Sequence, residues 1–302
     1  MAKRFRGVYA VTCTPFGADG EVDEAALRRH VRWLLDEGLV HGIIPAGSTG
    51  EFAFLTEAER RRVVAAVIDE VGGLVPVVAG AAACATRDTV HYAQMAQDQG
   101  AVGVMVVPPY YGHLSQVELY NHFKTLAENI DIPLMLYNNP GAAGSDLLPE
   151  TVARLAGLER VAAVKESTGI MQRVVEIQRL CGEQIEVLCG CDTLPLEMFL
   201  VGVEGWVAAP ANTIPRQCVE LFHLAVEEKD IPRARALYHR LLPLFALFEG
   251  SGQYVQLNKC ALEMLGRPIG QPRPPLLPPA IETQVSLKKL LEDILGEGMR
   301  GG

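Results

Sequence analysis

Residues 40–51 read Val-His-Gly-Ile-Ile-Pro-Ala-Gly-Ser-Thr-Gly-Glu, a short apolar run that ends in a polar turn flanked by glycines. The run is apolar at almost every position rather than at alternate ones, which is typical of a strand covered on both faces in a parallel sheet. Thr56 and Glu59 follow with the spacing of a capping box, as do Ser115 and Glu118 further along, and each pair predicts the start of a helix. The segment therefore predicts one strand–turn–helix unit of an α/β fold.

Seven other apolar runs resemble this one, and helical periodicity lies between them. The eight runs span residues 8–14, 40–46, 75–81, 102–107, 132–137, 161–164, 185–189 and 205–209. Eight such units in roughly 220 residues match the size of a closed (β/α)₈ TIM barrel. The alternative, a doubly wound open sheet, usually has a glycine-rich turn after its first strand, whereas residues 12–15 here read Thr-Cys-Thr-Pro. The barrel is therefore the favoured fold.

The strand pattern ends after Pro215, and the remaining chain is expected to be helical. Four helices are predicted, at residues 216–228, 231–248, 254–265 and 286–295. The proline-rich connector at 268–279 is expected to be extended, because each proline fixes φ and lacks an N–H donor. We expect residues 1–228 to form a catalytic barrel and residues 229–302 to form an appended C-terminal helical region.

Charge and hydropathy limit the possible partners. The 302 residues include 27 basic and 36 acidic ones, a formal net charge of −9, which argues against binding to nucleic acid or to an anionic membrane surface. No apolar run approaches the roughly 20 residues that span a bilayer. The apolar stretch that follows Lys3, Arg4 and Arg6 is interrupted before it forms a signal-peptide core. We therefore expect a cytoplasmic protein that binds a small molecule.

The cysteines and histidines show no spacing of metal ligands. The seven cysteines include no Cys-x-x-Cys pair, and the seven histidines are scattered, mostly over helical segments. Cys189 and Cys191 lie two residues apart, but a metal or redox role for them would need a second pair or a nearby histidine. Buried small hydrophobes or free thiols are the simpler interpretation in a reducing compartment, and no metal site is expected.

Lys165 is the most informative polar residue, because the active site of such a barrel lies at the carboxyl ends of the strands. It follows the apolar run 161–164 without a break, so we expect it inside the barrel. Burial disfavours the charged form of an amine, and a neutral amine can attack a carbonyl group to form a Schiff base. The alternative is a structural lysine that reaches the rim or pairs with Glu166. Neighbouring strand residues point to opposite faces, which places Glu166 badly for that pairing.

Three other strand ends carry polar groups of interest. The turn at 47–50 offers two hydroxyls and successive N–H groups that can bind a carboxylate, although a strand-to-helix turn without a ligand is as good an interpretation. It lacks the lysine of a nucleotide-binding loop. Tyr137 can move protons near an imine, or it can be a core tyrosine with a satisfied hydroxyl. Tyr110 and Tyr111 follow two prolines and can project across a subunit boundary.

Together these motifs resemble those of the dihydrodipicolinate synthase/N-acetylneuraminate lyase family, over almost the whole chain. The motifs that carry the resemblance are Gly47-Ser48-Thr49-Gly50-Glu51, Tyr110-Tyr111, Tyr137-Asn138 and Lys165-Glu166. The family consists of class I aldolases, which form Schiff bases with 2-oxo acids. The resemblance implies a homotetrameric (β/α)₈ barrel that uses no metal and no organic cofactor.

The resemblance also implies roles for the residues at matching positions. Lys165 matches the Schiff-base lysine, and Tyr137 matches the tyrosine that relays protons. Ser48 and Thr49 match the pair that holds the carboxylate of the 2-oxo acid, and Ser48 also belongs to the hydroxyl relay. Tyr111 is similar to the tyrosine that the synthases contribute to the site of a neighbouring subunit.

Three more residues are expected at the pocket. Val207 matches the position in the eighth strand whose backbone carbonyl lines the pocket, and Asn139 and Asp192 are expected to contact the substrate tail. Ala142, in contrast, stands where the synthases have an arginine that clamps the carboxylate of the second substrate. The condensation of pyruvate with aspartate semialdehyde is therefore not the favoured reaction.

Other departures concern the sialic acid lyases and feedback regulation. These lyases hold their sugar tail with an Asp-Glu pair and a serine, but here Thr193 follows the aspartate and Ala209 lies near the expected serine. Cys84 and Arg60 replace the asparagine and histidine that the synthases use for inhibition by lysine, so no such inhibition is expected.

We therefore expect a Schiff-base-dependent lyase, that is, an aldolase, dehydratase or deaminase, that acts on pyruvate-type or 2-oxo-3-deoxy acids. Two alternatives remain open. The first is a true dihydrodipicolinate synthase that binds aspartate semialdehyde with another cation. The second is a non-catalytic barrel that binds a small acid, for which saturable binding would survive the Lys165→Ala substitution.

Overall fold

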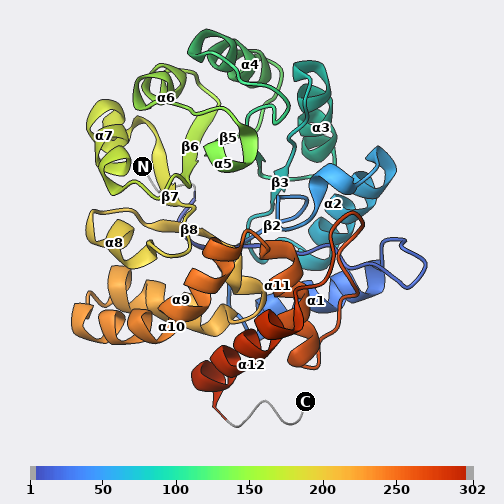
Figure 1. The fold of residues 1–302 in the computed structure, drawn as a ribbon. Coiled ribbons are helices and arrows are strands. Elements are labelled where there is room, and N and C mark those ends of the chain that lie inside the picture. Colours follow the sequence, from blue (N-terminus) through green and yellow to red (C-terminus); the bar gives the residue numbers. More distant parts are fainter. Residues whose placement is uncertain (1–4, 297–302) are drawn as a thin grey trace.

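The computed structural model describes residues 5–296, and its centre is a sheet of eight parallel strands surrounded by helices (Figure 1). The strands are β1 (Gly7–Val11), β2 (Gly42–Ile44), β3 (Val78–Gly80), β4 (Gly103–Val106), β5 (Leu134–Asn138), β6 (Val161–Glu166), β7 (Glu186–Cys189) and β8 (Gly205–Ala208). They pair in the order β2-β1-β8-β7-β6-β5-β4-β3, and a parallel bridge between Ile43 and Val77 joins the two ends of the sheet. The expected (β/α)₈ TIM barrel is confirmed.

Helices follow the strands, and all of them except the short α5 (Pro140–Ala143), which lies at the end of β5, cover the outer face of the barrel (Figure 1). They are α1 (Glu24–Asp36), α2 (Glu57–Val71), α3 (Thr86–Asp98), α4 (Gln116–Glu128), α5, α6 (Pro149–Ala156), α7 (Met171–Cys181), α8 (Pro195–Leu200) and α9 (Pro215–Phe222). Both predicted capping boxes are present: Thr56 opens α2 and Ser115 opens α4, each with a glutamate at the third helical position. Asp23 caps α1, since its side chain accepts a hydrogen bond from the Ala26 N–H.

Seven of the eight strands end at a residue other than the predicted one, and two of these differences bear on the candidate site. The first strand ends at Val11 rather than at residue 14, because Asn212 takes over the backbone groups that follow: its Nδ2 donates to the Val11 carbonyl, and its Oδ1 accepts from the Cys13 N–H. The sixth strand continues through Lys165 to Glu166, whose carbonyl accepts from the Gly190 N–H at 2.9 Å. Lys165 is thus part of the strand.

The appended helical region is also present. It contains α10 (Ile231–Ser251), α11 (Tyr254–Met264) and α12 (Ile281–Leu295), which pack against one another beside the barrel (Figure 1). The predicted start of the last helix, at residue 286, is wrong by five residues. The added turn exposes 74% of Ile281 and 64% of Val285 to solvent, so its sequence lacks the amphipathic pattern of a packed helix. The segment 216–228 is α9 followed by a π-helical turn, His223–Glu227.

Aromatic packing connects this region to the barrel. Trp206 of β8 is fully buried and meets Phe245 of α10 edge-on, with ring centroids 5.6 Å apart. The division between domains at residues 228 and 229 stays a prediction. The basic residues Lys3 and Arg4, and residues 297–302 of the predicted helical region, lie outside the described part of the chain. Within residues 5–296, no helix combines the length and the apolar content needed to cross a bilayer.

Candidate active site

Lys165 and Tyr137 lie side by side on neighbouring strands. They are register partners in β6 and β5, and the Lys165 Nζ lies 4.0 Å from the centre of the Tyr137 ring. Both side chains are buried, with 7% of Lys165 and 5% of Tyr137 exposed. The amine therefore has an aromatic face beside it in place of water, an arrangement that stabilises a cation modestly while keeping the nitrogen free of a carboxylate partner.

A glycine makes room for the lysine side chain. Gly190 follows β7, and a Cβ atom placed on it would lie 2.7 Å from Lys165 Cγ and 2.8 Å from Lys165 Cε. Such a Cβ would also lie 2.0 Å from the Ser167 Oγ. Any larger residue at position 190 would displace the side chains of Ser167 and Lys165, because these distances are shorter than van der Waals contact.

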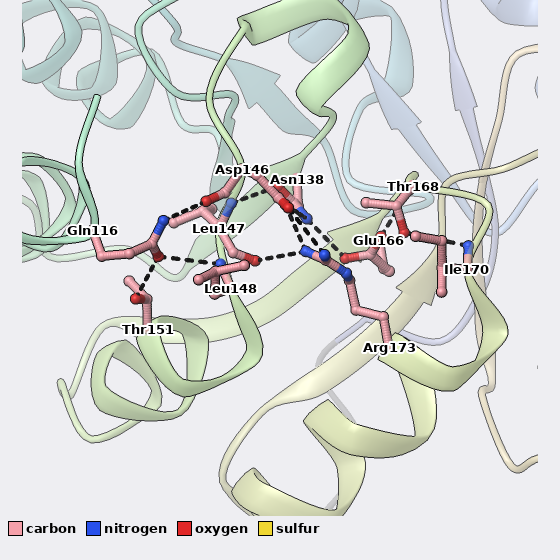
Figure 2. Close-up of polar contacts among 10 residues, drawn as sticks. All are labelled: Gln116, Asn138, Asp146, Leu147, Leu148, Thr151, Glu166, Thr168, Ile170 and Arg173. Atoms are coloured by element: carbon pink, nitrogen blue, oxygen red, sulfur yellow. Dashed lines mark hydrogen bonds and ion pairs between the residues drawn. The ribbon is translucent and has the colours of Figure 1, made fainter. Parts of the chain in front are cut away.

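The carboxylate next to the lysine points elsewhere, as the alternation of strand residues requires. Glu166 accepts a hydrogen bond from Asn138 Nδ2 at 3.0 Å and another from the Thr168 N–H at 2.7 Å (Figure 2). Asn138 is in turn the register partner of Glu166 on β5. This pair holds the carboxyl ends of β5 and β6 together on the face opposite to Tyr137 and Lys165.

A wider network supports that pair (Figure 2). Asn138 also donates to Asp146 Oδ1 at 3.1 Å, and Arg173 of α7 binds both oxygens of Asp146, at 2.5 and 2.9 Å. Gln116 of α4 donates to the Asp146 carbonyl and accepts from the Thr151 hydroxyl. Because these bonds connect α4, α6 and α7 to the ends of the two strands, they limit the movement of the strands that carry Lys165 and Tyr137.

Asn139 holds the Tyr137 hydroxyl. Its Nδ2 donates to the Tyr137 hydroxyl oxygen at 2.9 Å, and its Oδ1 accepts from the Ala142 N–H at 3.1 Å, where it caps α5. An N–H donor at the phenol oxygen leaves the phenol proton free to be donated to another group. The predicted contact between Asn139 and the substrate tail stays a prediction.

The glycine-flanked turn after β2 is well ordered by its own hydrogen bonds. The Gly50 N–H donates to the Gly47 carbonyl at 3.0 Å, and the Thr14 hydroxyl donates to the Gly50 carbonyl at 2.7 Å. Thr49 is buried, whereas Ser48 is exposed. The turn therefore presents a hydroxyl at an accessible edge of the barrel.

Ser48 opens onto a cavity of about 210 Å³ with mainly apolar walls. The cavity is lined by Ser48, Glu51, Phe52, Ala53, Phe54, Val107, Tyr110 and Ala142. Ala142 thus faces the same cavity as the turn, and it brings no charge there. A neutral wall at this point does not compensate a carboxylate on a bound molecule.

Two other predicted residues lie at opposite extremes of exposure. Val207 of β8 is buried, and its neighbour Trp206 packs against the helix layer, so the alternation of strand residues turns Val207 toward the barrel interior. The Tyr111 ring is 88% exposed in this chain.

Asp192, after β7, is buried beside half-buried polar residues of the C-terminal helices, Glu249 and Tyr254. Its Oδ1 accepts from Trp206 Nε1 at 2.8 Å, and its N–H donates to Glu249 Oε1 of α10 at 2.6 Å. Burial, and after it the charge of Glu249, raises the pKa of Asp192 to about 8. Burial likewise raises the pKa of Tyr254. Since Trp206 already occupies one oxygen, the contact of Asp192 with substrate stays a prediction.

Several of these neighbours carry no signal in the sequence. Glu249 and Tyr254 lie far from Asp192 in the chain, and no local pattern links them to it. Ser167 lies two residues after Lys165 in the sequence. Only the structure shows that its Oγ is buried and has no hydrogen-bond partner among the described residues. Its position near Lys165 makes it a further polar group of the site.

The described residues include no group of three or more His, Cys, Asp or Glu side chains that could hold a metal ion. Cys189 and Cys191 both carry free thiols.

Comparison with known proteins places the chain among enzymes of one family. The family model for dihydrodipicolinate synthetases matches residues 4–294. A 4-hydroxy-tetrahydrodipicolinate synthase from Pelobacter propionicus is 38% identical over 278 residues, which cover 91% of this chain and 93% of that protein. The structure of dihydrodipicolinate synthase from Aquifex aeolicus has a TM-score of 0.91 at 35% identity and covers 95% of this chain and 97% of its own.

A third relative was solved with a small molecule. It is the chloride-inhibited dihydrodipicolinate synthase from Acinetobacter baumannii, complexed with pyruvate, with a TM-score of 0.90 at 31% identity; the match covers 96% of this chain and 98% of that one. The similarity therefore includes the barrel and the C-terminal helices.

The raised pKa of Asp192 predicts a pH dependence of stability. An aspartate in the unfolded chain ionises near pH 4, whereas Asp192 in the folded chain keeps its proton until about pH 8, so the folded state binds an extra proton between these values. The free energy of unfolding is expected to fall as the pH rises from 4 to 8, by up to about 1.4 kcal/mol per pH unit from this group.

Urea unfolding at fixed protein concentration across this pH range measures the slope. Asp192→Asn is expected to flatten it, because the amide does not ionise and its oxygen can still accept from Trp206. The exposed Asp293→Asn serves as the matched control and is expected to keep the wild-type slope. If the free energy of unfolding falls with pH as steeply in Asp192→Asn as in the wild type, the raised pKa of Asp192 is not the cause of that fall.

Proposed function

The chain belongs to the dihydrodipicolinate synthetase family and is an enzyme of its lyase class, and on this premise we propose that it acts on pyruvate-type or 2-oxo-3-deoxy acids through a Schiff base on Lys165. The observation that carries the proposal is the buried Lys165 amine, 4.0 Å from the Tyr137 ring at the carboxyl ends of β6 and β5. Membership of this lyase class does not agree with the alternative that the chain is a non-catalytic binding barrel.

In the proposed reaction the Lys165 nitrogen bonds to the carbonyl carbon of the 2-oxo acid. The nitrogen gives up two protons, and the carbonyl oxygen leaves as water, which yields the imine. The protonated imine withdraws electrons, so that a bond next to it can break or form. Tyr137 donates and accepts the protons of these steps, because its phenol proton is not used in its bond with Asn139.

The substrate carboxylate is assigned to Ser48 and Thr49 together with the N–H groups of their turn. Fixing this group and the carbonyl carbon at two points would orient the substrate for attack by the amine. Val207 is proposed to line the pocket with its backbone carbonyl, and Asn139 and Asp192 to contact the tail. The reaction as proposed uses no metal and no organic cofactor.

We propose a homotetramer in the cytoplasm, in which Tyr111 completes the hydroxyl relay of a neighbouring subunit together with Ser48. Its 88% exposed ring supports this role, because a tyrosine that reaches into another subunit must project from its own.

The second candidate is a true dihydrodipicolinate synthase, which condenses pyruvate with aspartate semialdehyde. The names of the relatives favour it. Against it stands Ala142, which gives the cavity beside Ser48 no cation to pair with the semialdehyde carboxylate. Arg60 does not replace that cation, because its guanidinium donates to the carbonyls of Ala82 and Phe52 and is buried.

Trapping of the imine tests the proposed mechanism. Incubation with pyruvate and borohydride, followed by intact-mass measurement and peptide mapping, is expected to show one reduced adduct, on Lys165. Lys165→Ala is expected to abolish the adduct, and the exposed Lys289→Ala to retain it. Tyr137→Phe is expected to slow turnover by about 10²–10⁴-fold through loss of proton transfer. An unmodified wild-type protein after trials with several 2-oxo acids would refute the mechanism.

Turnover with aspartate semialdehyde separates the two candidates. We expect weak use of this substrate by the wild type. Ala142→Arg is expected to raise kcat/KM for it by about ten- to hundredfold, the range that a hydrogen bond to a charged group provides. Ala142→Gln supplies similar size without the charge and is the control. Efficient turnover by the wild type would instead establish the second candidate, and a screen of 2-oxo-3-deoxy sugar acids would then be expected to find no better substrate.

A further inference from the structure

A buried ion pair connects the turn after β2 to the C-terminal helical region. Glu51 Oε1 and Lys259 Nζ lie 2.6 Å apart, and their side chains are 0% and 2% exposed. The ammonium group also donates to the Gln271 carbonyl at 3.0 Å and lies 4.3 Å from the centre of the Phe16 ring. The other oxygen of Glu51 accepts from the Arg273 N–H at 2.8 Å. Both carboxylate oxygens are thus held by residues more than 200 positions away in the chain.

Glu51 is the residue at which the turn ends, and its backbone is strained. Its φ of 59° lies in the left-handed region, which residues other than glycine rarely adopt. Its N–H donates to the Ser48 carbonyl at 3.1 Å, and its carbonyl accepts from the Phe54 N–H at 2.9 Å. Such a conformation persists only where the surrounding structure enforces it, and here the contacts of the carboxylate provide that enforcement.

The proline-rich connector strengthens the same attachment. The Arg273 guanidinium binds both oxygens of Glu59, at 2.6 and 2.9 Å, and donates to the Phe54 carbonyl at 2.8 Å. The connector therefore holds both the segment that follows the turn, through the Arg273 guanidinium, and one oxygen of Glu51, through the Arg273 N–H, while α11 holds the other oxygen of Glu51 through Lys259.

The ion pair is costly as a source of stability alone. Burial lowers the pKa of Lys259, and the nearby Glu51 opposes that change by favouring the charged form. Apolar residues of similar volume often stabilise a core as well as a buried ion pair does, whereas the ion pair imposes one geometry. Because the Glu51–Lys259 pair lies at the end of the turn 47–50, the geometry that it imposes is that of this turn.

We propose that Lys259 is a positioning residue for substrate binding: through Glu51 it holds the turn 47–50 in the shape in which Ser48 and Thr49 bind the carboxylate of the 2-oxo acid. The inference rests on the proposed function, and it adds that the C-terminal helical region takes part in substrate recognition. Lys259 acts through Glu51 and is not itself a catalytic residue.

Lys259→Met in the full chain tests the proposal by two measurements. Hydrogen exchange of the amides at 47–54 is expected to become about tenfold faster or more, because the Glu51 carboxylate keeps only its bond from the Arg273 N–H and loses its bond to α11. The pyruvate concentration that gives half-maximal borohydride trapping on Lys165 is expected to rise about tenfold, while trapping at saturating pyruvate stays near the wild-type value, since the amine and Tyr137 are unchanged.

Two further variants make the result decisive. Lys259→Met combined with Glu51→Gln leaves no unpaired buried charge, so it is expected to fold even if the single variant does not, and to show the same two changes. Arg32→Met is the matched control. It removes an ion pair of 2.8 Å with Glu70 between α1 and α2, and it is expected to leave both measurements at their wild-type values.

A purely structural role would lower the melting temperature and leave the half-saturation within about twofold of the wild type. That result in a folded variant overturns the proposal, whether or not exchange at 47–54 is faster. Unchanged exchange overturns it as well. Absence of trapping in the wild type would instead refute the Schiff-base mechanism, and the exchange measurement would still show whether Lys259 holds the turn.

Discussion

The candidate site depends on one constraint: an amine must be kept out of water and out of an ion pair at the carboxyl end of a barrel strand. The barrel meets this constraint by placing Lys165 near the end of β6 and Tyr137 beside it on β5. Glu166, the nearest carboxylate in sequence, is turned to the opposite face and held there by Asn138. Gly190 leaves the space that the lysine side chain fills. Together these features leave Lys165 with the surroundings that the proposed covalent chemistry requires.

The C-terminal helices contribute to this site from a distance. Glu249 of α10 places a second acid beside Asp192, and Lys259 of α11 reaches the turn that carries Ser48. The helices therefore do more than cover the barrel wall, since they contact the loops after β7 and β2. Such long-range bonds tie the precision of loop positions to the packing of the whole chain.

Much of the architecture could be predicted from the sequence, because a strand covered on both faces needs a continuous apolar run and a helix start needs a cap. The eight runs and the boxes at Thr56 and Ser115 illustrate this. The predicted end of β1 was wrong because a residue distant in the chain, Asn212, binds the backbone there. The predicted start of α12 was wrong for another reason: its first turn is exposed and carries no amphipathic signal. The placement of Lys165 on a strand end was predictable, because the apolar run before it is local. The pairing of Glu51 with Lys259 was not predictable, because it forms only when the turn after β2 packs against α11.

In the proposed mechanism Lys165 reacts only if its side chain fits the space beside Gly190, and Gly190→Ala tests this requirement most directly. The rate of pyruvate adduct formation on Lys165 in this variant should be compared with that in Gly250→Ala, where an added Cβ meets no atom within 4 Å. We expect the rate of adduct formation to fall by about 100-fold in a folded Gly190→Ala variant and to stay unchanged in Gly250→Ala. Equal rates in the two variants would contradict this requirement.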